Sequence, residues 1–545
     1  MLVPRVFLPL AVGLSLLGTS CTTPPLDRAA AAWKVLGETD PGPVRAEYAG
    51  YEYRQAVASV VRGLASQPPA RWPRQVELPG KNGPWTLHIA QGGRNIHEVW
   101  SPAVLDGVRI IPALEQHRPE KIQVHRPGLG APLLGIHKPR KTDVDAKFIP
   151  AKGQYLPVTA AIDFQGPSQA TLHLLDPREV DAMPVMGQER PLAADFLKPV
   201  LKSLQVTNFL KATVGGTLRP GNFLSKNGLF LMEPYRRDKV PVIFIHGLMA
   251  DPHIWRAHAA TLMADPDIGP RIQCWYFVYP TGLPVVASSK WFREALAELK
   301  SQVDPDHNDP GFKNILIIGH SMGGVIARMQ VTNSGDIFWK TWFQCTPDQL
   351  KLDAASKKEL KEMLFFKANP DVKRLIFMNT PHHGSRMAGS WLGRWGSSLV
   401  RSPGDMLNLV SQVATLDLDR INPNRGRFDT FGVDGIKSLR PDHPLIMDLA
   451  KQPIHAKSHS IIGELFGSGA DPSKSSDGVV PYESAHLEEA ESEIVVPTWH
   501  GDVANRWTVR ELRRILREHL NLKPLPVDPA EKSSVESSSG SLQGS

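Results

Sequence analysis

Cysteine is scarce in this sequence, with only 3 cysteines among 545 residues. Three cysteines cannot build a disulfide scaffold. Aromatic residues make up 7% of the chain, and no run of basic residues interleaves with them as in a nucleic-acid-binding stripe. Motifs of phosphatases, metalloenzymes and nucleotide-dependent enzymes are also missing. We therefore expect no nucleic-acid partner, no metal site and no organic cofactor.

The overall composition is that of a globular protein. Hydrophobic residues account for 41% and charged residues for 21% of the chain, which excludes wholesale disorder and a multi-span membrane protein. The net charge of +7 indicates a mildly basic, well-solvated surface. A chain of 545 residues predicts several domains or one large domain with a companion, and no internal repeat divides it.

The first twenty residues have the features of an export signal. Arg5 precedes an apolar stretch, 6–17, that is too short to cross a bilayer as a helix. A charged start, a short apolar segment and a small-residue exit predict a secretory signal peptide over 1–20. The small residues before Cys21 resemble the bacterial lipoprotein signal, although Gly18 stands where that family usually has leucine.

This resemblance implies that Cys21 becomes the lipid-bearing mature N-terminus. The protein would then be exported and lipid-anchored in the bacterial cell envelope, at the outer membrane or in the periplasm. The alternative is ordinary cleavage near residue 20, with Cys21 incidental. Cys274 and Cys345 would remain, and the sequence leaves open whether they pair or stay as thiols.

The region 27–235 has no recognisable function. Its first part, to about residue 68, has a helical pattern, clearest at Val57, Val60, Val61 and Leu64. From about residue 85, short alternating runs between prolines and glycines predict a β-rich segment. At the other end, 524–545 is polar and predicts a disordered tail.

From residue 240 to about 522 the pattern changes to alternating β and α segments. Near-continuous apolar runs are typical of strands buried on both faces of a parallel sheet. They occur at 240–247, 272–280, 314–321, 372–381, 459–464 and 492–498. Helical patterns lie between them, including 291–300, the segment after Ser321 and 507–520. This alternation predicts an α/β fold with a mostly parallel sheet covered on both sides.

A G-x-S-x-G motif lies between one predicted strand and the next helix. Gly319 and Gly323 flank Ser321 at the position where a sharp turn exposes a nucleophilic serine. Because a Cβ would clash in so tight a bend, glycine suits the flanking positions. The order of strand, turn and helix supports Ser321 as the nucleophile.

A serine nucleophile needs a base, and the base needs an orienting acid. In the α/β-hydrolase order these follow as Asp or Glu and then His, on loops after later strands. Asp477 follows the apolar run 459–464, and His500 follows the run 492–498. We therefore assign Asp477 as the acid and His500 as the base.

Other residues compete for these two roles less well. His382 and His383 precede every suitable acid, and His486 comes too soon after Asp477 and before the last strand. His459 begins a strand and is better explained as structural. Asp471 lies in a Gly/Ser/Pro-rich loop, where a solvated aspartate is the ordinary expectation.

Negative charge on the attacked carbonyl needs preorganised N–H donors. The backbone amide of Met322, directly after the nucleophile, is one candidate. The second should come from the loop after the first core strand, where Gly247 permits close approach; Leu248 is the first choice and Met249 the second. His246 is expected to brace this loop and not to react.

With these residues assigned, 240–520 resembles the bacterial lipase and esterase branch of the α/β-hydrolase superfamily. The matching segments are 246–248, 319–324, 379–385, 476–480 and the late His500. The segment 320–328 also resembles the inositol deacylases that act on GPI anchors. The resemblance covers about half of the chain and does not extend to 27–235.

The resemblance raises two further points, a calcium ion and a lid. Lipases of this kind often hold a calcium ion near the histidine loop. Asp502 fits one of its ligand positions, but His455 stands where the second carboxylate ligand is expected. We therefore predict no metal. Apolar lids are also common in this family. Two insertions, 333–371 and 386–455, could form one, and the alternative is that their aromatic residues belong to the core.

The sequence thus predicts a serine hydrolase that cleaves carboxylic esters, with a lipid or another ester as substrate, through an acyl-enzyme. An acyltransferase, thioesterase or amidase on the same triad is an alternative, because specificity lies in the pocket. A surface-anchored binding protein that uses 27–235 and carries a relic hydrolase domain is another. The oligomeric state is not indicated by the sequence.

Overall fold

The computed structural model describes residues 23–92, 100–112, 124–205, 227–248, 250–281, 283–386, 420–422, 437–465 and 471–525. The expected signal peptide, Cys21 and Met249 lie outside these residues, as do most of the insertion 386–455 and nearly all of the C-terminal tail. Within the described residues, no helix is both long enough and apolar enough to cross a bilayer.

The chain divides into two compact units whose segments interleave. The first unit comprises Met1–Pro119, His125–His137 and Pro157–Asp195. The second unit comprises Glu120–Val124, Lys138–Leu156 and Phe196–Ser545.

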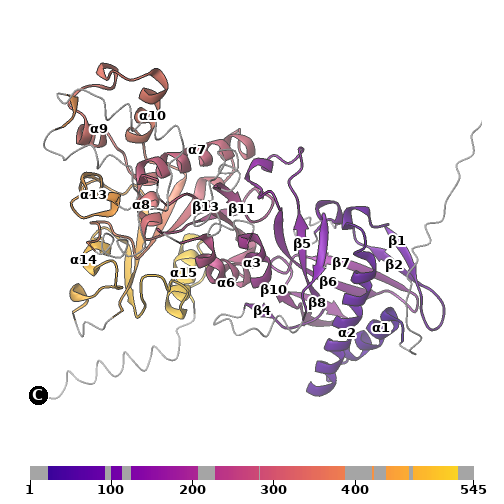
Figure 1. The fold of residues 1–545 in the computed structure, drawn as a ribbon. Helices are drawn as coiled ribbons and strands as arrows, with labels where there is room; N and C mark the ends of the chain where they lie inside the picture. Colours follow the sequence, from indigo (N-terminus) through magenta and orange to yellow (C-terminus); the bar gives the residue numbers. More distant parts are fainter. Residues whose placement is uncertain are drawn as a thin grey trace, which may run out of the picture. The chain divides into compact units, whose positions relative to one another are not determined.

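The first unit combines a helical hairpin with a β-sheet (Figure 1). Helices α1 (Pro25–Leu36) and α2 (Pro43–Leu64) pack against each other, and Val57, Val60 and Val61 of the predicted helical face are buried. A six-stranded sheet has the order β1 (Gln75–Leu78), β2 (Trp85–Ile89), β7 (Gln169–Leu175), β6 (Gln154–Phe164), β5 (Ala131–His137), β3 (Gly107–Ile110). Two small ribbons pair β4 (His125–Arg126) with β10 (Ala194–Asp195) and β8 (Ala182–Val185) with β9 (Gln188–Pro191).

The second unit is built on a seven-stranded sheet. Its order is β11 (Gly228–Leu231), β13 (Ile272–Val278), β12 (Val240–Ile245), β14 (Ile315–His320), β15 (Val372–Met378), β16 (Lys457–Gly463), β17 (Ser492–Val496). All neighbouring pairs are parallel except β11 with β13. Every residue of β12, β13 and β14 is buried, as the unbroken apolar runs predicted.

Helices cover both faces of this sheet. Helix α7 (Val285–Val303) packs on α8 (Met322–Arg328), and α6 (Arg256–Ala264) packs on α3 (Leu197–Gln205) and α15 (Arg506–His519). These two groups lie on opposite sides of the sheet (Figure 1). The shorter helices are α9 (Ile337–Trp342), α10 (Ala354–Leu364), α13 (Pro444–Ala450) and α14 (Tyr482–Ala485).

The second unit begins earlier in the chain than the predicted boundary at residue 240. Strand β11 extends the sheet by pairing with β13, and the segment Lys138–Leu156 also belongs to this unit. Asp145 accepts a hydrogen bond from the Tyr235 amide at 2.8 Å, and Gln154 donates to the Leu231 carbonyl at 3.1 Å. The assignment of 138–156 and 228–231 to the N-terminal region is therefore corrected.

The aromatic residues of the insertion 333–371 are interior side chains. Phe338, Trp339, Trp342 and Phe343 are at most 4% exposed and belong to the main hydrophobic core of the second unit. Their positions agree with the alternative that these aromatic residues belong to the core and do not form a lid. Within the described residues, no disulfide joins Cys274, which is buried, to Cys345, which is partly buried.

Candidate active site

Ser321 lies at the turn between strand β14 and helix α8. Its φ of 53° and ψ of −124° fall in a region that non-glycine residues rarely adopt. Its backbone amide donates to the Met378 carbonyl of the next strand at 2.9 Å, which holds the turn against the sheet. The strained backbone is typical of a functional position, because the surrounding structure must stabilise it.

The glycines around Ser321 leave no room for side chains. A Cβ at Gly323 would lie 2.4 Å from the Ile245 carbonyl oxygen, and one at Gly324 would lie 1.9 Å from the Thr380 Oγ1. A Cβ at Gly319 would lie 2.6 Å from the Cα of Gly324. Helix α8 therefore packs closely against the strand ends, as the motif predicts.

The structure brings Ser321, His500 and Asp477 together in one hydrogen-bonded chain. The Ser321 Oγ lies 3.0 Å from Nε2 of His500, and Nδ1 of the same ring lies 2.6 Å from Oδ2 of Asp477. Oδ1 of Asp477 accepts from the amides of Val479 and Val480 at 2.9 and 2.7 Å. With Asp477 ionised, Nδ1 carries the ring proton and Nε2 is free to accept the serine proton.

One family of known proteins matches part of the second unit. Residues 236–340 match the family described as PGAP1-like alpha/beta domain. A serine on a strained strand-to-helix turn above a parallel sheet, followed in the chain by Asp and then His, is the arrangement of one superfamily. The second unit has an α/β-hydrolase fold.

Several solved structures are similar to part of this chain. The Bacillus licheniformis lipase BlEst2 in mature form is 16% identical with a TM-score of 0.30, covering 53% of this chain and 97% of its own. A lipase-esterase related protein from Clostridium acetobutylicum is 12% identical with a TM-score of 0.25, covering 55% and 99%.

A third solved structure is the metagenomic carboxyl esterase MGS0156, which is 14% identical with a TM-score of 0.27 and covers 52% of this chain and 76% of its own. The comparison with curated proteins returned no match. The strand order and the family match together identify the fold.

The loop after β12 packs directly against the serine of the hydrolase unit. A Cβ at Gly247 would lie 2.9 Å from the Ser321 Cβ, so only glycine allows this approach. His246 is buried and stacks on Tyr279, whose hydroxyl donates to the His246 carbonyl at 2.7 Å. Burial lowers the pKa of His246 to about 4, so this ring is neutral. Leu248 is the next residue along the chain.

The backbone of His500 is also fixed by neighbouring side chains. Its amide donates to the Asp477 carbonyl at 2.9 Å. Its carbonyl accepts from His320 Nε2 at 2.8 Å and from Asn379 Nδ2 at 3.2 Å. The sequence did not single out His320 or Asn379, because the first occupies a variable position of the G-x-S-x-G motif and the second lies at the end of a strand.

Each competing histidine has a different environment in the hydrolase unit. His382 is buried against Arg328, which lies 3.3 Å from its Nδ1, and burial holds its pKa well below the usual value. The His486 Nδ1 lies 2.8 Å from Glu493, and the His459 Nδ1 lies 2.7 Å from the Ser492 hydroxyl.

The two other competitors are exposed to solvent. The side chain of His383 faces solvent. Asp471, the rival acid, is partly exposed and lies within 3.3 Å of Lys474. Among the residues considered, only His500 and Asp477 are joined to Ser321.

The residues near the expected calcium position do not fit that ion. Calcium prefers several oxygen ligands, most of them carboxylates. Asp502 is the only carboxylate of the expected pair, and the His455 ring nitrogen instead lies 2.9 Å from the Asn333 side-chain amide. Another group, His459, Glu491 and Glu518, has closely spaced ligand atoms, but Arg374 contacts all three and supplies the positive charge.

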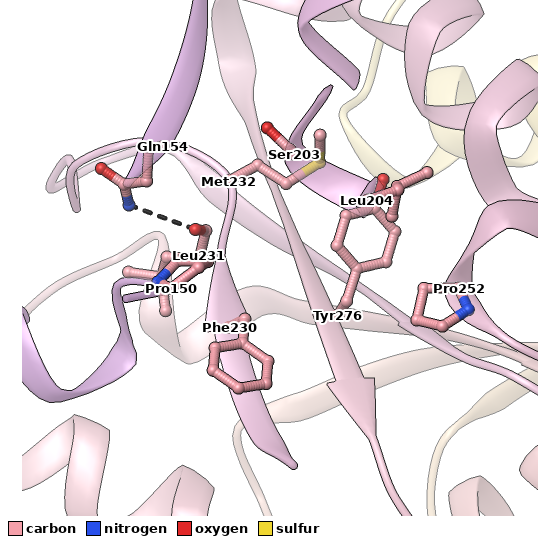
Figure 2. Close-up of a pocket in the computed structure, with 9 residues that line it drawn as sticks. All are labelled: Pro150, Gln154, Ser203, Leu204, Phe230, Leu231, Met232, Pro252 and Tyr276. Carbon is pink, nitrogen blue, oxygen red and sulfur yellow. Dashed lines mark hydrogen bonds between the residues drawn. The ribbon is translucent and has the colours of Figure 1, made fainter. Parts of the chain in front are cut away.

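A small cavity also lies in the hydrolase unit, away from these residues. Apolar side chains of β11 and its neighbours line it, together with Gln154, Ser203 and Tyr276 (Figure 2). Ser321, Asp477 and His500 are not among its lining residues. We therefore assign this cavity no part in the chemistry of the serine.

Proposed function

We propose that this protein is a serine hydrolase that cleaves carboxylic ester bonds of lipids. The observation that carries the proposal is the hydrogen-bonded chain from Ser321 Oγ through His500 to Asp477, with distances of 3.0 and 2.6 Å. A hydroxyl is a weak nucleophile until a positioned base removes its proton. The α/β-hydrolase fold is compatible with many reactions, so the proposal depends on the geometry of this site.

The proposed reaction proceeds through an acyl-enzyme. Ser321 Oγ attacks the ester carbonyl carbon while His500 Nε2 takes the hydroxyl proton, and Asp477 stabilises the imidazolium that forms. The tetrahedral intermediate collapses as the C–O bond to the alcohol breaks and His500 donates the proton to the leaving oxygen. Water then attacks the acyl-enzyme with His500 as base, and the carboxylic acid is released.

The negative oxygen of the tetrahedral intermediate needs two donors. We assign them to the backbone amides of Met322 and Leu248. Met322 is the first residue of α8, where helix amides have no partner within the helix. The close approach of Gly247 to Ser321 supports Leu248, since it fixes the loop beside the serine. Losing one such donor typically costs about 3 kcal/mol of transition-state stabilisation.

Labelling with a fluorophosphonate probe tests the nucleophile. We expect the full-length protein to be labelled and the Ser321→Ala variant to be unlabelled. Ser460→Ala is a matched control, because Ser460 is also a buried serine of the same sheet, 2% exposed. Labelling that persists in Ser321→Ala would contradict Ser321 as the nucleophile. A lack of labelling in the unchanged protein would contradict the proposal and favour the binding protein with a relic hydrolase domain.

The acyl chain length tests the class of ester. Steady-state hydrolysis of p-nitrophenyl esters from acetate to palmitate, presented in mixed micelles, should show kcat/KM maintained or rising for long chains. An enzyme that hydrolyses acetate and butyrate but loses activity beyond about eight carbons would be a short-chain esterase. In that case the proposed triad would be retained, and the proposed lipid substrate would be wrong.

We also propose that the protein is exported and carries a lipid on Cys21. The support is the sequence of residues 1–21 alone. Growth with an alkyne fatty acid, followed by click labelling, should mark the protein and not its Cys21→Ala variant. Cys345→Ser is the control, because Cys345 is the more accessible of the two remaining thiols. Equal labelling of Cys21→Ala would leave ordinary signal cleavage as the explanation.

A further inference from the structure

Two side chains outside the catalytic triad converge on a single atom of the base. The carbonyl oxygen of His500 accepts from His320 Nε2 at 2.8 Å and from Asn379 Nδ2 at 3.2 Å. His320 is 4% exposed and Asn379 is 3% exposed, so water does not compete for these bonds. A buried carbonyl with two side-chain donors is held more firmly than one that faces solvent.

The same two residues connect the base to the ends of three strands. His320 is the last residue of β14 and directly precedes the nucleophile. Asn379 follows β15; its amide donates to the Ile461 carbonyl at 3.0 Å and its Oδ1 accepts from the Gly463 amide at 2.7 Å. The backbone of Asn379 has a φ of 49°, an unfavourable conformation that these contacts must maintain.

Close packing makes the arrangement rigid. A Cβ at Gly463 would lie 3.0 Å from the Asp477 Cβ and 3.1 Å from the Asn379 Oδ1, so Asn379 and the acid share one glycine. The rings of His320 and His500 are 4.9 Å apart between centroids. The ring of His320 must be neutral, because a second positive charge would oppose the imidazolium formed during the reaction. Burial, together with the charge of His500, lowers the pKa of His320 to about 3.

We infer that His320 and Asn379 are positioning residues for the proposed hydrolase reaction: they fix the peptide carbonyl of His500 and thereby hold its ring in line between Ser321 and Asp477. This inference rests on the proposed function. Misplacing a catalytic group by about 1 Å can cost about 100-fold in rate. The side chain before the nucleophile thus sets the place of the base, although the two are 180 positions apart in the chain.

The test uses His320→Leu, which removes the donor, and His320→Gln, whose side-chain amide can replace Nε2. We expect His320→Leu to lower kcat for a p-nitrophenyl ester about 10- to 100-fold with KM within about twofold, and His320→Gln to recover most of that loss. The second-order rate of fluorophosphonate labelling should fall in parallel with kcat. Asn379→Asp should reduce both rates, since a carboxylate cannot donate to the carbonyl.

His519→Leu is the matched control. His519 is another buried histidine of the hydrolase unit, and its Nε2 lies 2.9 Å from a backbone carbonyl, that of Asn314. The control should lower Tm as much as His320→Leu does while kcat stays unchanged. A merely structural role of His320 would give equal losses of Tm and equal kcat in the two variants.

The inference and the proposed function fail in different ways. If the unchanged protein shows no Ser321-dependent labelling, the proposed function fails. If the unchanged protein is labelled, and His320→Leu and Asn379→Asp are labelled at the same rate as the unchanged protein, the proposed triad is retained and the positioning role is overturned. A kcat loss in His320→Leu that His320→Gln does not recover would also overturn it, because the hydrogen bond would then not be the cause.

Discussion

At the scale of single residues, the turn at Ser321 depends on glycines, because a side chain at these positions would clash with its neighbours. Gly324 allows α8 to approach the end of β15, where Thr380 fills the space that a Cβ would occupy, at 1.9 Å from the Thr380 Oγ1. We expect Gly324→Ala to reduce the free energy of unfolding by about 1–3 kcal/mol, in the range found for overpacking. Urea unfolding followed by fluorescence measures this loss.

Thr380→Ala provides the matched test of the cause. If the clash with Thr380 is responsible, the double variant should be more stable than the sum of the two single changes predicts, with a coupling of at least about 0.5 kcal/mol. Simple additivity of the two changes would show that Gly324 is needed for another reason.

The residues of the proposed triad can be found in the sequence because each lies in a motif or follows an apolar run, in a fixed order along the chain. Ser321 lies in a five-residue pattern between a strand and a helix, and Asp477 and His500 each follow an apolar run in the expected order. The role of His320 could not be predicted in this way. Its partner is a backbone carbonyl 180 positions away, and a carbonyl is present at every residue, so no residue type indicates the contact.

At the scale of elements, helix α15 connects the histidine loop to the body of the hydrolase unit. Arg513 and Arg517 of this helix pair with Asp265 at 2.7 and 3.5 Å, and Asp265 also accepts the amides of Asp267 and Ile268. Its carboxylate is 1% exposed. Asp265→Asn should therefore lower the free energy of unfolding by about 2 kcal/mol, less than for a fully buried pair because Arg513 is about one-third exposed.

Chemical unfolding of Asp265→Asn beside Asp348→Asn checks this prediction. Asp348 pairs with Lys361 at 3.0 Å, but its side chain is 85% exposed. Because exposed pairs contribute little, the control should change stability by less than about 0.5 kcal/mol. Equal effects of the two substitutions would mean that the pairing of Asp265 with α15 contributes no more to stability than an exposed ion pair.

The elements of the hydrolase sheet were predictable where their burial is complete. The apolar runs at 240–247, 272–280 and 314–321 became β12, β13 and β14, all fully buried. Strand β11 was not assigned to this sheet, since its apolar run, GLFL, is only four residues long and does not indicate which sheet it joins. It joins the sheet by antiparallel pairing with β13, and the sequence of β11 alone does not indicate this partner.

At the scale of the whole molecule, buried histidines make stability depend on pH. Burial lowers the pKa to about 4 for each of His246, His258, His459 and His519. In the unfolded chain these rings bind a proton near pH 6.5. Their contribution to stability is therefore present above about pH 6.5 and is lost as the pH falls towards about 4. One such ring accounts for about 3 kcal/mol over that interval.

Urea unfolding at pH 7, 6 and 5 checks this dependence. His519→Gln keeps a donor for the Asn314 carbonyl and removes one titrating ring. We expect the unchanged protein to lose stability as the pH falls, and the variant to lose up to about 1.4 kcal/mol less per pH unit. Identical slopes for the two proteins would show that His519 does not remain neutral in the folded state.

The interleaving of the two units limits how this protein can be divided. The chain enters the hydrolase unit at Glu120–Val124, again at Lys138–Leu156 and finally from Phe196. A fragment that starts at Phe196 would lack Asp145 and Gln154, the partners of Tyr235 and Leu231 beside the edge strand β11. Dividing the chain at any single position therefore cannot give a fragment that contains the complete hydrolase unit without part of the first unit.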